Sequence, residues 1–347
     1  MKAYVLHGIN DIRYEEVSAP SLQENEVLVK VMAAGVCGSD IPRIYRDGAH
    51  RMPLIPGHEF AGEVVQGTER TVQWQGKRVG IFPLIPCKAC APCKQKKYEM
   101  CRKYSYLGSR CDGGFAEYVA VPEWNLIELS PKVKPEAVAM MEPMAVAVHA
   151  MRAIAPGKSD TIVVSGLGTI GLLLLMFLKQ QGFERIMAIG NKEFQKQKSL
   201  ELGIRETEYY DSRAGKVSDW ILEQTGNLGA DIFFECVGTQ ENILTALSSS
   251  APGGKLMMIG NPASDMVLDK NTYWKILRHQ LTIMGTWNSS FTGSDEDDWH
   301  YVKLALESGT VHPEQLITHR FPLAELEKGL HIMRDKTEDY VKIMVKH

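Results

Sequence analysis

The sequence has no large excess of charge of either sign. Its 347 residues carry a formal net charge of -3, with 23% charged and 44% hydrophobic residues. This balance excludes strong electrostatic attraction to nucleic acid or to an anionic membrane surface. The chain also lacks tandem repeats, low-complexity segments and a charged-then-apolar leader at its first residues. We therefore expect a globular, cytoplasmic protein with small-molecule partners, and no nucleic acid or membrane among them.

Long hydrophobic runs are scarce as well. The stretch from Thr161 to Leu178 has no charged residue and just reaches the ~18 residues at which a membrane span becomes a candidate. Gly166, Gly168 and Gly171 interrupt it, with β-branched residues before them and leucines after. A strand, a tight turn and a buried helix explain this pattern better than one continuous helix. The sequence therefore predicts no membrane span.

The cysteine count argues against a disulfide framework. The chain has seven cysteines, an odd number, and no leader to direct it to an oxidising compartment, so a pair of disulfides is the weaker alternative. Four of the cysteines follow a Cys-x-x-Cys-x-x-Cys-x7-Cys spacing: Cys87, Cys90, Cys93 and Cys101. Four thiolates can surround one zinc ion and leave no position open for substrate. The spacing predicts a structural zinc site.

The length of the chain and the change in its hydrophobic pattern predict two domains. A chain of 347 residues exceeds the usual size of one hydrophobic core. Residues 1–150 contain short alternating runs broken by glycine and proline, which is typical of an antiparallel β-rich domain. Residues 151–287 alternate strand-like and helix-like segments, the pattern of a doubly wound parallel sheet in an α/β fold. Residues 288–347 lose this alternation, and we expect this tail to return to the first domain.

A glycine-rich turn lies between the first strand and the first helix of the second domain. Its sequence is Gly166-Leu167-Gly168-Thr169-Ile170-Gly171. In this context the first glycine allows a tight turn, the second lets backbone approach a pyrophosphate, and the third lets helix pack on strand. Free N–H groups at the helix N-terminus favour the phosphates. We expect this turn, including Thr169 and Ile170, to bind a dinucleotide; the alternative is an ordinary strand-helix turn.

The next strand indicates which dinucleotide is preferred. NAD-binding sites usually place Asp or Glu at its end to accept a hydrogen bond from the ribose 2'-hydroxyl. Here the strand is followed by Gly190, Asn191 and Lys192, with Lys196 one turn further on. Without a carboxylate to repel a 2'-phosphate, and with lysines nearby, the sequence favours NADP over NAD. The alternative is that the lysines lie on a solvated helix face and that NAD binds.

Three further segments contain residues suited to an open, catalytic zinc site. Cys37 lies in Val-Cys-Gly-Ser-Asp, His58 and Glu59 lie in Pro-Gly-His-Glu-Phe, and Glu142 lies in Met-Glu-Pro. Catalytic zinc takes three protein ligands and keeps one position for water or substrate. Taken singly, each of these residues is more often structural. Their occurrence together with a four-cysteine lobe and a dinucleotide turn favours the catalytic interpretation.

The order of these motifs resembles the zinc-dependent medium-chain dehydrogenase/reductase superfamily over essentially the whole chain. Met141-Glu142-Pro143 and the segments Thr318–Leu323 and Lys342–Met344 are similar to the polyol (sorbitol) dehydrogenase branch. Within that branch the chain resembles galactitol-1-phosphate 5-dehydrogenases, which share four segments with it: Ser39-Asp40-x-Pro42-Arg43-Ile44, Gly48-Ala49-His50, Gly57-His58-Glu59-Phe60 and Gly108-Ser109-Arg110-x-Asp112-Gly113-Gly114. The resemblance implies a GroES-like catalytic domain, a Rossmann domain and a C-terminal segment that rejoins the first, in a homodimer or homotetramer.

The resemblance also implies two zinc ions per subunit and roles at the active site. Cys37 and His58 would bind the catalytic zinc, with Glu59 and Glu142 as ligands or as partners through water. Ser39 would pass on the substrate proton, although Pro42 stands where many alcohol dehydrogenases end this relay with a histidine.

Arg43 follows Ser39 and Asp40 in the segment that the resemblance places beside the metal. It would suit a substrate phosphate, because its planar fork can make two parallel hydrogen bonds. The alternative is an ion pair with Asp40 or Asp47, or a place at a subunit interface.

The implied reaction is hydride transfer between NAD(P) and a secondary hydroxyl of a sugar alcohol, with a sugar-alcohol phosphate such as galactitol 1-phosphate favoured. One alternative is an unphosphorylated polyol of the sorbitol or iditol type. Another is a different secondary alcohol, such as threonine or butanediol. A non-enzymatic nucleotide-binding protein is a third alternative, and the full set of catalytic ligands argues against it.

Overall fold

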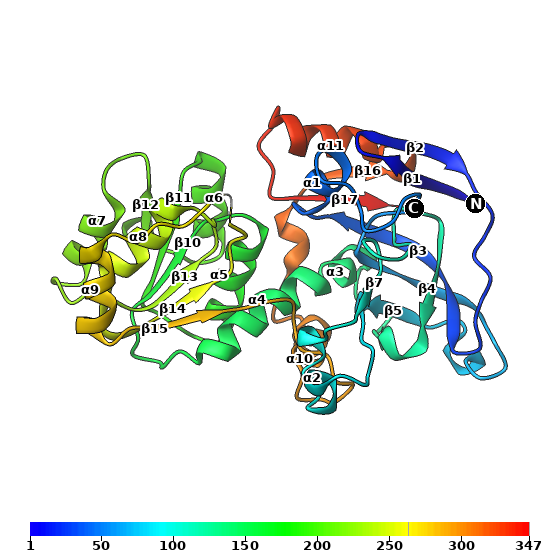
Figure 1. Cartoon of the computed structure of the whole chain (residues 1–347), viewed down its shortest axis with the longest axis horizontal. Helices are drawn as coiled ribbons and strands as arrows, with labels where there is room; N and C mark the ends of the chain where they lie inside the picture. Colours follow the sequence, from blue (N-terminus) through cyan, green and yellow to red (C-terminus); the bar gives the residue numbers. More distant parts are fainter. Residues whose placement is uncertain (263, 347) are drawn as a thin grey trace. The chain divides into compact units, whose positions relative to one another are not determined.

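The chain divides into two compact units. The computed structural model describes residues 1–262 and 264–346. The first unit comprises Met1–Ala145 together with the segment from Ser289 onward, and the second comprises Val146–Asn288. Figure 1 shows the two units, each with its own sheet. The segment from Ser289 onward therefore folds with the N-terminal part of the chain.

The second unit is built on a six-stranded, wholly parallel sheet. Its strands lie in the order β12-β11-β10-β13-β14-β15. They are β10 (Ile162–Ser165), β11 (Ile186–Gly190), β12 (Tyr209–Asp211), β13 (Ala230–Glu235), β14 (Ser250–Met258) and β15 (Thr282–Gly285). In chain order this is 3-2-1-4-5-6, the doubly wound arrangement, so the fold prediction for this part is confirmed. Ligands of such sheets bind where the order reverses, at the carboxyl ends of β10 and β13.

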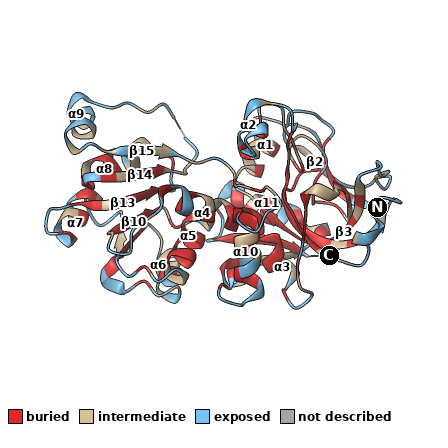
Figure 2. Cartoon of the chain, turned by 90° about the horizontal axis from the view of Figure 1, so that it is seen from below, coloured by how far each residue is buried: buried red, intermediate tan, exposed pale blue. Residues whose placement is uncertain are grey.

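Helices connect these parallel strands. They are α5 (Thr169–Gln180), α6 (Glu193–Glu201), α7 (Val217–Gln224), α8 (Gln240–Ser249) and α9 (Lys270–His279), and α4 (Met141–Ile154) precedes β10. Helix α5 is buried along most of its length, because its leucine-rich sequence presents apolar side chains on every face. Helix α9 has no buried residue and is largely exposed (Figure 2).

The charge-free stretch noted in the sequence forms β10, a turn and α5, as its glycines predict. In the described part of the chain, no helix combines the length and the apolar character that crossing a membrane requires.

The first unit contains a seven-stranded, mainly antiparallel sheet. Its order is β16-β17-β3-β4-β5-β9, and β8 also pairs with β3. The strands are β3 (Glu26–Val36), β4 (Glu59–Gly67), β5 (Arg78–Ile81), β8 (Tyr118–Pro122), β9 (Leu126–Glu128), β16 (Ile317–Pro322) and β17 (Lys342–Lys346). Alternate residues Val27, Val29 and Val31 of β3 are fully buried, as the period of two in the sequence predicts.

Smaller elements surround this sheet. Two further strand pairs are β1 (Lys2–Gly8) with β2 (Asp11–Glu16) and β6 (Leu84–Ile85) with β7 (Ser105–Tyr106). The helices are α1 (Asp40–Tyr45), α2 (Ala91–Lys94), α3 (Pro135–Ala139), α10 (Asp298–Glu307) and α11 (Leu326–Asp335). Buried residues of α11 join the same hydrophobic core as β1, β3 and β17.

The last strand lies beside the segment that leads into the first metal-binding motif. β17 pairs antiparallel with the end of β3, so that Ile343 faces Val36 and Lys346 faces Ala33. Cys37 follows Val36 directly. The C-terminal strand therefore brings its own side chains next to the candidate active site.

Candidate functional site

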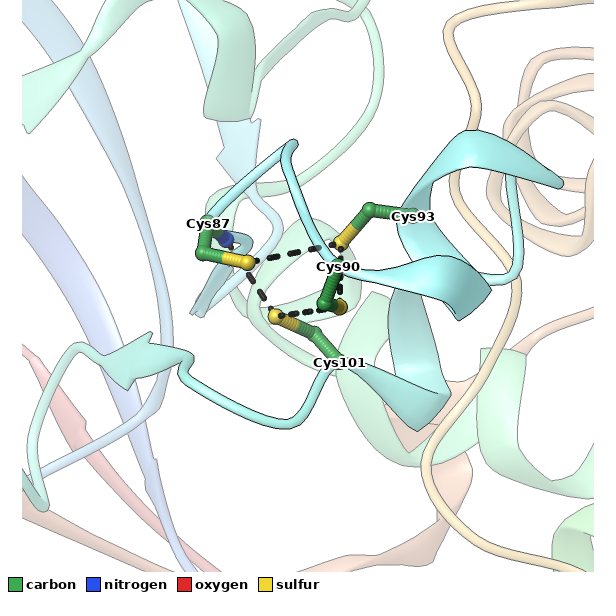
Figure 3. Close-up of side chains that lie close together, drawn as sticks. All are labelled: Cys87, Cys90, Cys93 and Cys101. Atoms are coloured by element: carbon green, nitrogen blue, oxygen red, sulfur yellow. Dashed lines mark hydrogen bonds between the residues drawn. The ribbon is translucent and has the colours of Figure 1, made fainter.

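The four cysteines of the predicted structural site form one cluster in the loop around α2 (Figure 3). The Sγ–Sγ distances are 3.4 Å for Cys90–Cys93, 3.9 Å for Cys90–Cys101 and 4.0 Å for Cys87–Cys93. A zinc tetrahedron with Zn–S bonds of about 2.3 Å has sulfur–sulfur edges of about 3.8 Å. Backbone N–H groups of Arg102 and Cys93 lower the pKa of Cys90 to about 6, which favours the thiolate. The residues fit a closed four-thiolate zinc site.

A second group of donor atoms lies where β3 ends and β4 begins. The candidate ligand atoms of Cys37, His58 and Glu59 all lie within 4.8 Å of one another, and His58 and Glu59 are buried. Gly57 sets the direction of this segment with a φ of +94°, and a Cβ there would come within 2.6 Å of the Phe115 ring. One thiolate, one imidazole and one carboxylate make a three-ligand set that suits an open zinc site.

Asp40 contacts two members of this group, Cys37 and His58. It is fully buried in the first turn of α1, accepts a hydrogen bond from the Cys37 backbone N–H at 3.0 Å, and lies 3.5 Å from His58 Nδ1. Burial opposes the charged form of His58, but Asp40 and Cys37 raise its pKa well above the usual value. Carboxylates in this position orient a metal-binding histidine and fix its tautomer.

Arg43 makes the ion pair that the sequence offered as its alternative role. Its Nη1 pairs with Asp40 Oδ1, and only 17% of the Arg43 side chain is exposed. The guanidinium therefore neutralises the buried carboxylate beside His58. Ser39, at the N-cap of α1, lies with its Oγ 3.4 Å from Cys37 Sγ.

Glu142 lies near the cluster but outside the group of three. It is the second residue of α4 and accepts a hydrogen bond from the Tyr106 hydroxyl at 3.1 Å. Burial raises the pKa of Glu142, and the charge of Glu59 raises it further. The Tyr106 ring meets the His58 ring edge-on at 5.9 Å between centroids. Tyr106 did not emerge from the sequence, because a tyrosine in a two-residue strand carries no signal of its own.

Lys342 is a second residue that the sequence did not identify. Its ammonium group pairs with Glu59 Oε2, both side chains are 2% exposed, and Nζ also donates to the Val36 carbonyl at 3.0 Å. Burial opposes its charged form, but Glu59 and Cys37 raise the pKa of Lys342. Lys342 begins β17 between the apolar residues Val341 and Ile343, and a buried lysine there is unusual; this was the available signal.

The glycine turn has the geometry that a bound pyrophosphate requires. Gly166 has a φ of +97°, which only glycine adopts readily. A Cβ on Gly168 would meet nothing within 4 Å, whereas a Cβ on Gly171 would overlap the Gly166 carbonyl oxygen. Thr169 begins α5, and Ile170 follows it. The middle glycine is thus open to a ligand, while the third lets helix and strand pack closely.

The end of β11 has no carboxylate where the ribose would lie. A Cβ on Gly190 would lie 2.9 Å from Gln195 Oε1, which accepts a hydrogen bond from the Asn191 backbone at 3.0 Å. Lys196 pairs with Glu206 at 2.6 Å, and Lys192 Nζ lies 5.4 Å from the centre of the Phe194 ring. The charge of Lys196, one of the two lysines that the sequence predicted for a 2'-phosphate, is therefore already paired with Glu206.

A Cys-His-Glu donor set in one unit and a glycine-rich strand-helix turn in the other are typical of zinc-dependent oxidoreductases that transfer hydride. Residues 23–131 match the alcohol dehydrogenase GroES-like domain, and residues 169–306 match the zinc-binding dehydrogenase domain. The chain belongs to the zinc-binding alcohol dehydrogenase family, in the medium-chain dehydrogenase/reductase superfamily, as its motif order indicated.

Named relatives of this family cover almost the whole chain. It is 31% identical to galactitol 1-phosphate 5-dehydrogenase of Escherichia coli K12 over 323 residues, 92% of each chain. It is 33% identical to L-threonine 3-dehydrogenase of Bacillus licheniformis over 330 residues, again 92% of each. The crystal structure of galactitol-1-phosphate dehydrogenase from E. coli superposes with a TM-score of 0.91 and 28% identity over 100% of both chains.

Proposed function

We propose that the protein oxidises a secondary hydroxyl of a sugar-alcohol phosphate such as galactitol 1-phosphate and transfers the hydride to NADP. The cluster of Cys37, His58 and Glu59 carries this proposal, because it can hold a metal with a position left open for substrate. The 31% identity to a galactitol 1-phosphate dehydrogenase supports the substrate class. The 33% identity to a threonine dehydrogenase makes threonine the second candidate substrate.

The protein residues divide the chemistry between them. Zinc, when bound, supplies a Lewis acid that lowers the pKa of a substrate hydroxyl. Ser39 Oγ would accept the proton of the substrate hydroxyl and pass its own proton on to water. Glu142 would hold a water or a hydroxyl near the ligand set through its carboxylate. Asp40 and Arg43 would keep the His58 ring in its ligating orientation. The second unit would position the nicotinamide, with its pyrophosphate at Gly168 and at the N-terminus of α5.

The same proposal includes the domain boundaries, the number of zinc ions and the cellular location. Residues 1–150 would form the catalytic domain with the structural-zinc lobe at 87–101, residues 151–287 the dinucleotide-binding domain, and residues 288–347 the segment that completes the first. The protein would hold two zinc ions per subunit and work in the cytoplasm.

Turnover of a matched substrate panel tests the proposal. NADP reduction would be followed by absorbance with galactitol 1-phosphate, galactitol, threonine and 2,3-butanediol. We expect the highest kcat/KM with the phosphate ester. A preference for threonine would move the assignment to the second candidate, and the absence of turnover with every alcohol would contradict the dehydrogenase function.

Cofactor choice gives a separate prediction. We expect Gly190→Asp to shift the ratio of kcat/KM for NADP over NAD by roughly ten- to a hundredfold toward NAD, because the carboxylate repels a 2'-phosphate and accepts from a 2'-hydroxyl. Gly190→Ala is the matched control: it adds the same Cβ against Gln195 without the charge, so it should affect both cofactors equally. A wild-type enzyme that strongly prefers NAD would contradict the NADP assignment.

Homo-oligomer formation is also part of the proposal. Large apolar side chains are exposed close together in the sequence on and around α9 and β15: Val267, Leu268, Tyr273, Trp274, Leu277, Ile283 and Trp287. Exposed apolar groups concentrated in one segment are typical of protein interfaces. We expect light scattering to give the mass of a dimer or tetramer, and Ile283→Asp to shift it toward the monomer. A monomeric wild-type protein would contradict this assignment.

A further inference from the structure

We propose that Arg110 binds the phosphate group of the substrate. This inference rests on the proposed function and deepens it, because it assigns phosphate recognition to a residue in the loop that follows β7. Arg110 belongs to the Gly-Ser-Arg segment, which none of the chemistry described above uses.

The guanidinium of Arg110 is held in place without being neutralised. Among residues 1–262 and 264–346, no carboxylate forms an ion pair with it, since none has an oxygen within 4.0 Å of the guanidinium. Its Cζ lies 4.4 Å from the centre of the Tyr104 ring, and its Nη2 lies 3.5 Å from the Tyr104 hydroxyl. Nη2 donates to the Tyr104 hydroxyl, and the aromatic face holds the planar fork in one orientation, so that its other N–H groups can be offered to a phosphate.

Three other arginines of the first unit differ in this respect. Arg43 pairs with Asp40, Arg46 with Asp47 at 2.8 Å, and Arg51 with Asp112 at 2.9 Å. Each of these cations already has a carboxylate partner, which a phosphate would have to displace. Arg110 can bind an anion without breaking an ion pair.

The backbone fixes Arg110 relative to the metal-binding residues. The Arg110 N–H donates to the Tyr106 carbonyl at 2.8 Å, and the Tyr106 hydroxyl donates to Glu142. The same loop is pressed against the segment that contains His58, since a Cβ on Gly108 would overlap the Gly57 carbonyl. Glycine at position 108 is therefore required for this close approach.

Two aromatic rings lie between the guanidinium and His58. The Tyr104 and Tyr106 rings meet edge-on at 6.2 Å, and Tyr106 meets His58 at 5.9 Å. In a hexitol 1-phosphate, six bonds separate carbon 5 from phosphorus, the length of two extended residues, about 7 Å. The proposal places the reacting carbon of the substrate at the metal-binding residues and extends the substrate along Tyr106, with its phosphate toward Arg110. The planar fork suits two oxygens of a phosphate monoester.

A matched set of variants tests this assignment on galactitol 1-phosphate and galactitol. We expect Arg110→Met, which keeps the stem and removes the charge, to lower kcat/KM for the phosphate ester roughly ten- to a hundredfold, mainly through KM, and to change that for galactitol less than about threefold. Arg110→Lys should recover part of the loss. Lys103→Met removes an exposed positive charge from the same region and should affect neither substrate.

Arg43→Met distinguishes the competing assignment. Since Arg43 neutralises Asp40 beside His58, we expect this variant to lose activity on both substrates alike. A loss confined to the phosphate ester in Arg43→Met, with equal losses on both substrates in Arg110→Met, would overturn the Arg110 assignment in favour of Arg43.

Binding separates failure of this inference from failure of the proposed function. Calorimetric titration with galactitol 1-phosphate measures affinity without turnover. If the wild type binds the ester through Arg110 but does not oxidise it, the phosphate site stands and the proposed reaction is wrong. If the wild type oxidises the ester and Arg110→Met binds it equally well, only the Arg110 assignment is wrong. If the wild type does not bind it, both are wrong.

Discussion

Cys37→Ser is expected to lower kcat/KM about a thousandfold while leaving the protein folded. Cys37 is the only thiol in the group with His58 and Glu59 among the described residues, and a neutral hydroxyl is a poor substitute for a thiolate ligand. Lewis-acid stabilisation by zinc supplies several kcal/mol of the barrier reduction, and each ~1.4 kcal/mol is a factor of ten in rate. Metal content by mass spectrometry and kcat/KM on the preferred alcohol measure the two parts of this prediction.

Cys90→Ser is the matched control, because it changes a thiolate of the other cluster. Cys87, Cys90, Cys93 and Cys101 leave no open ligand position, so this variant should lower thermal stability before it lowers catalysis. The wild type should contain two zinc ions per chain, and each variant should lose one. A single zinc in the wild type, together with an active Cys37→Ser, would show that the Cys37 cluster is not the catalytic site.

The sequence predicted those features that depend on neighbouring residues. The order of strands and helices after Thr161 follows from hydrophobic periodicity, because a parallel sheet covered on both faces needs short, wholly apolar strands such as Ile162–Ser165. The glycine turn was recognised because Gly166 and Gly171 have roles set by local backbone geometry. The four-cysteine site was recognised for the same reason, since its ligands lie within one loop.

Partners far apart in the sequence could not be predicted in this way. Lys342 and Glu59 meet only because β17 pairs with β3 beside Cys37, and nothing near Glu59 in the sequence points to a lysine so distant. Tyr106 and Glu142 also meet only in the fold, although their separation of 36 residues is much shorter. Arg43 and Lys196 have partners closer in the sequence, Asp40 and Glu206. The positive charge alone did not show whether each side chain would bind a phosphate of a ligand or pair with a carboxylate of the protein.

Lys342→Met is expected to destabilise the first unit by about 3–5 kcal/mol. The ammonium group and Glu59 are both buried, so removing one leaves an uncompensated carboxylate in a low-dielectric interior. Methionine has a similar length and fills the space, which confines the effect to the lost charge and the lost hydrogen bond to Val36. For a unit of this size the Tm should fall by roughly 6–20 °C, measured by calorimetry.

Two further variants distinguish charge compensation from packing. Glu59→Gln combined with Lys342→Met removes both charges and should recover much of the lost stability. Lys342→Arg keeps the charge, but it must fit a larger group between Glu59 and the Gly35 backbone. Metal should also change the size of the effect. If Glu59 binds zinc directly, the cation replaces part of the missing positive charge, so Lys342→Met should cost less in the zinc-loaded protein than after chelation. An equal loss in both forms would indicate that Glu59 does not bind the metal directly.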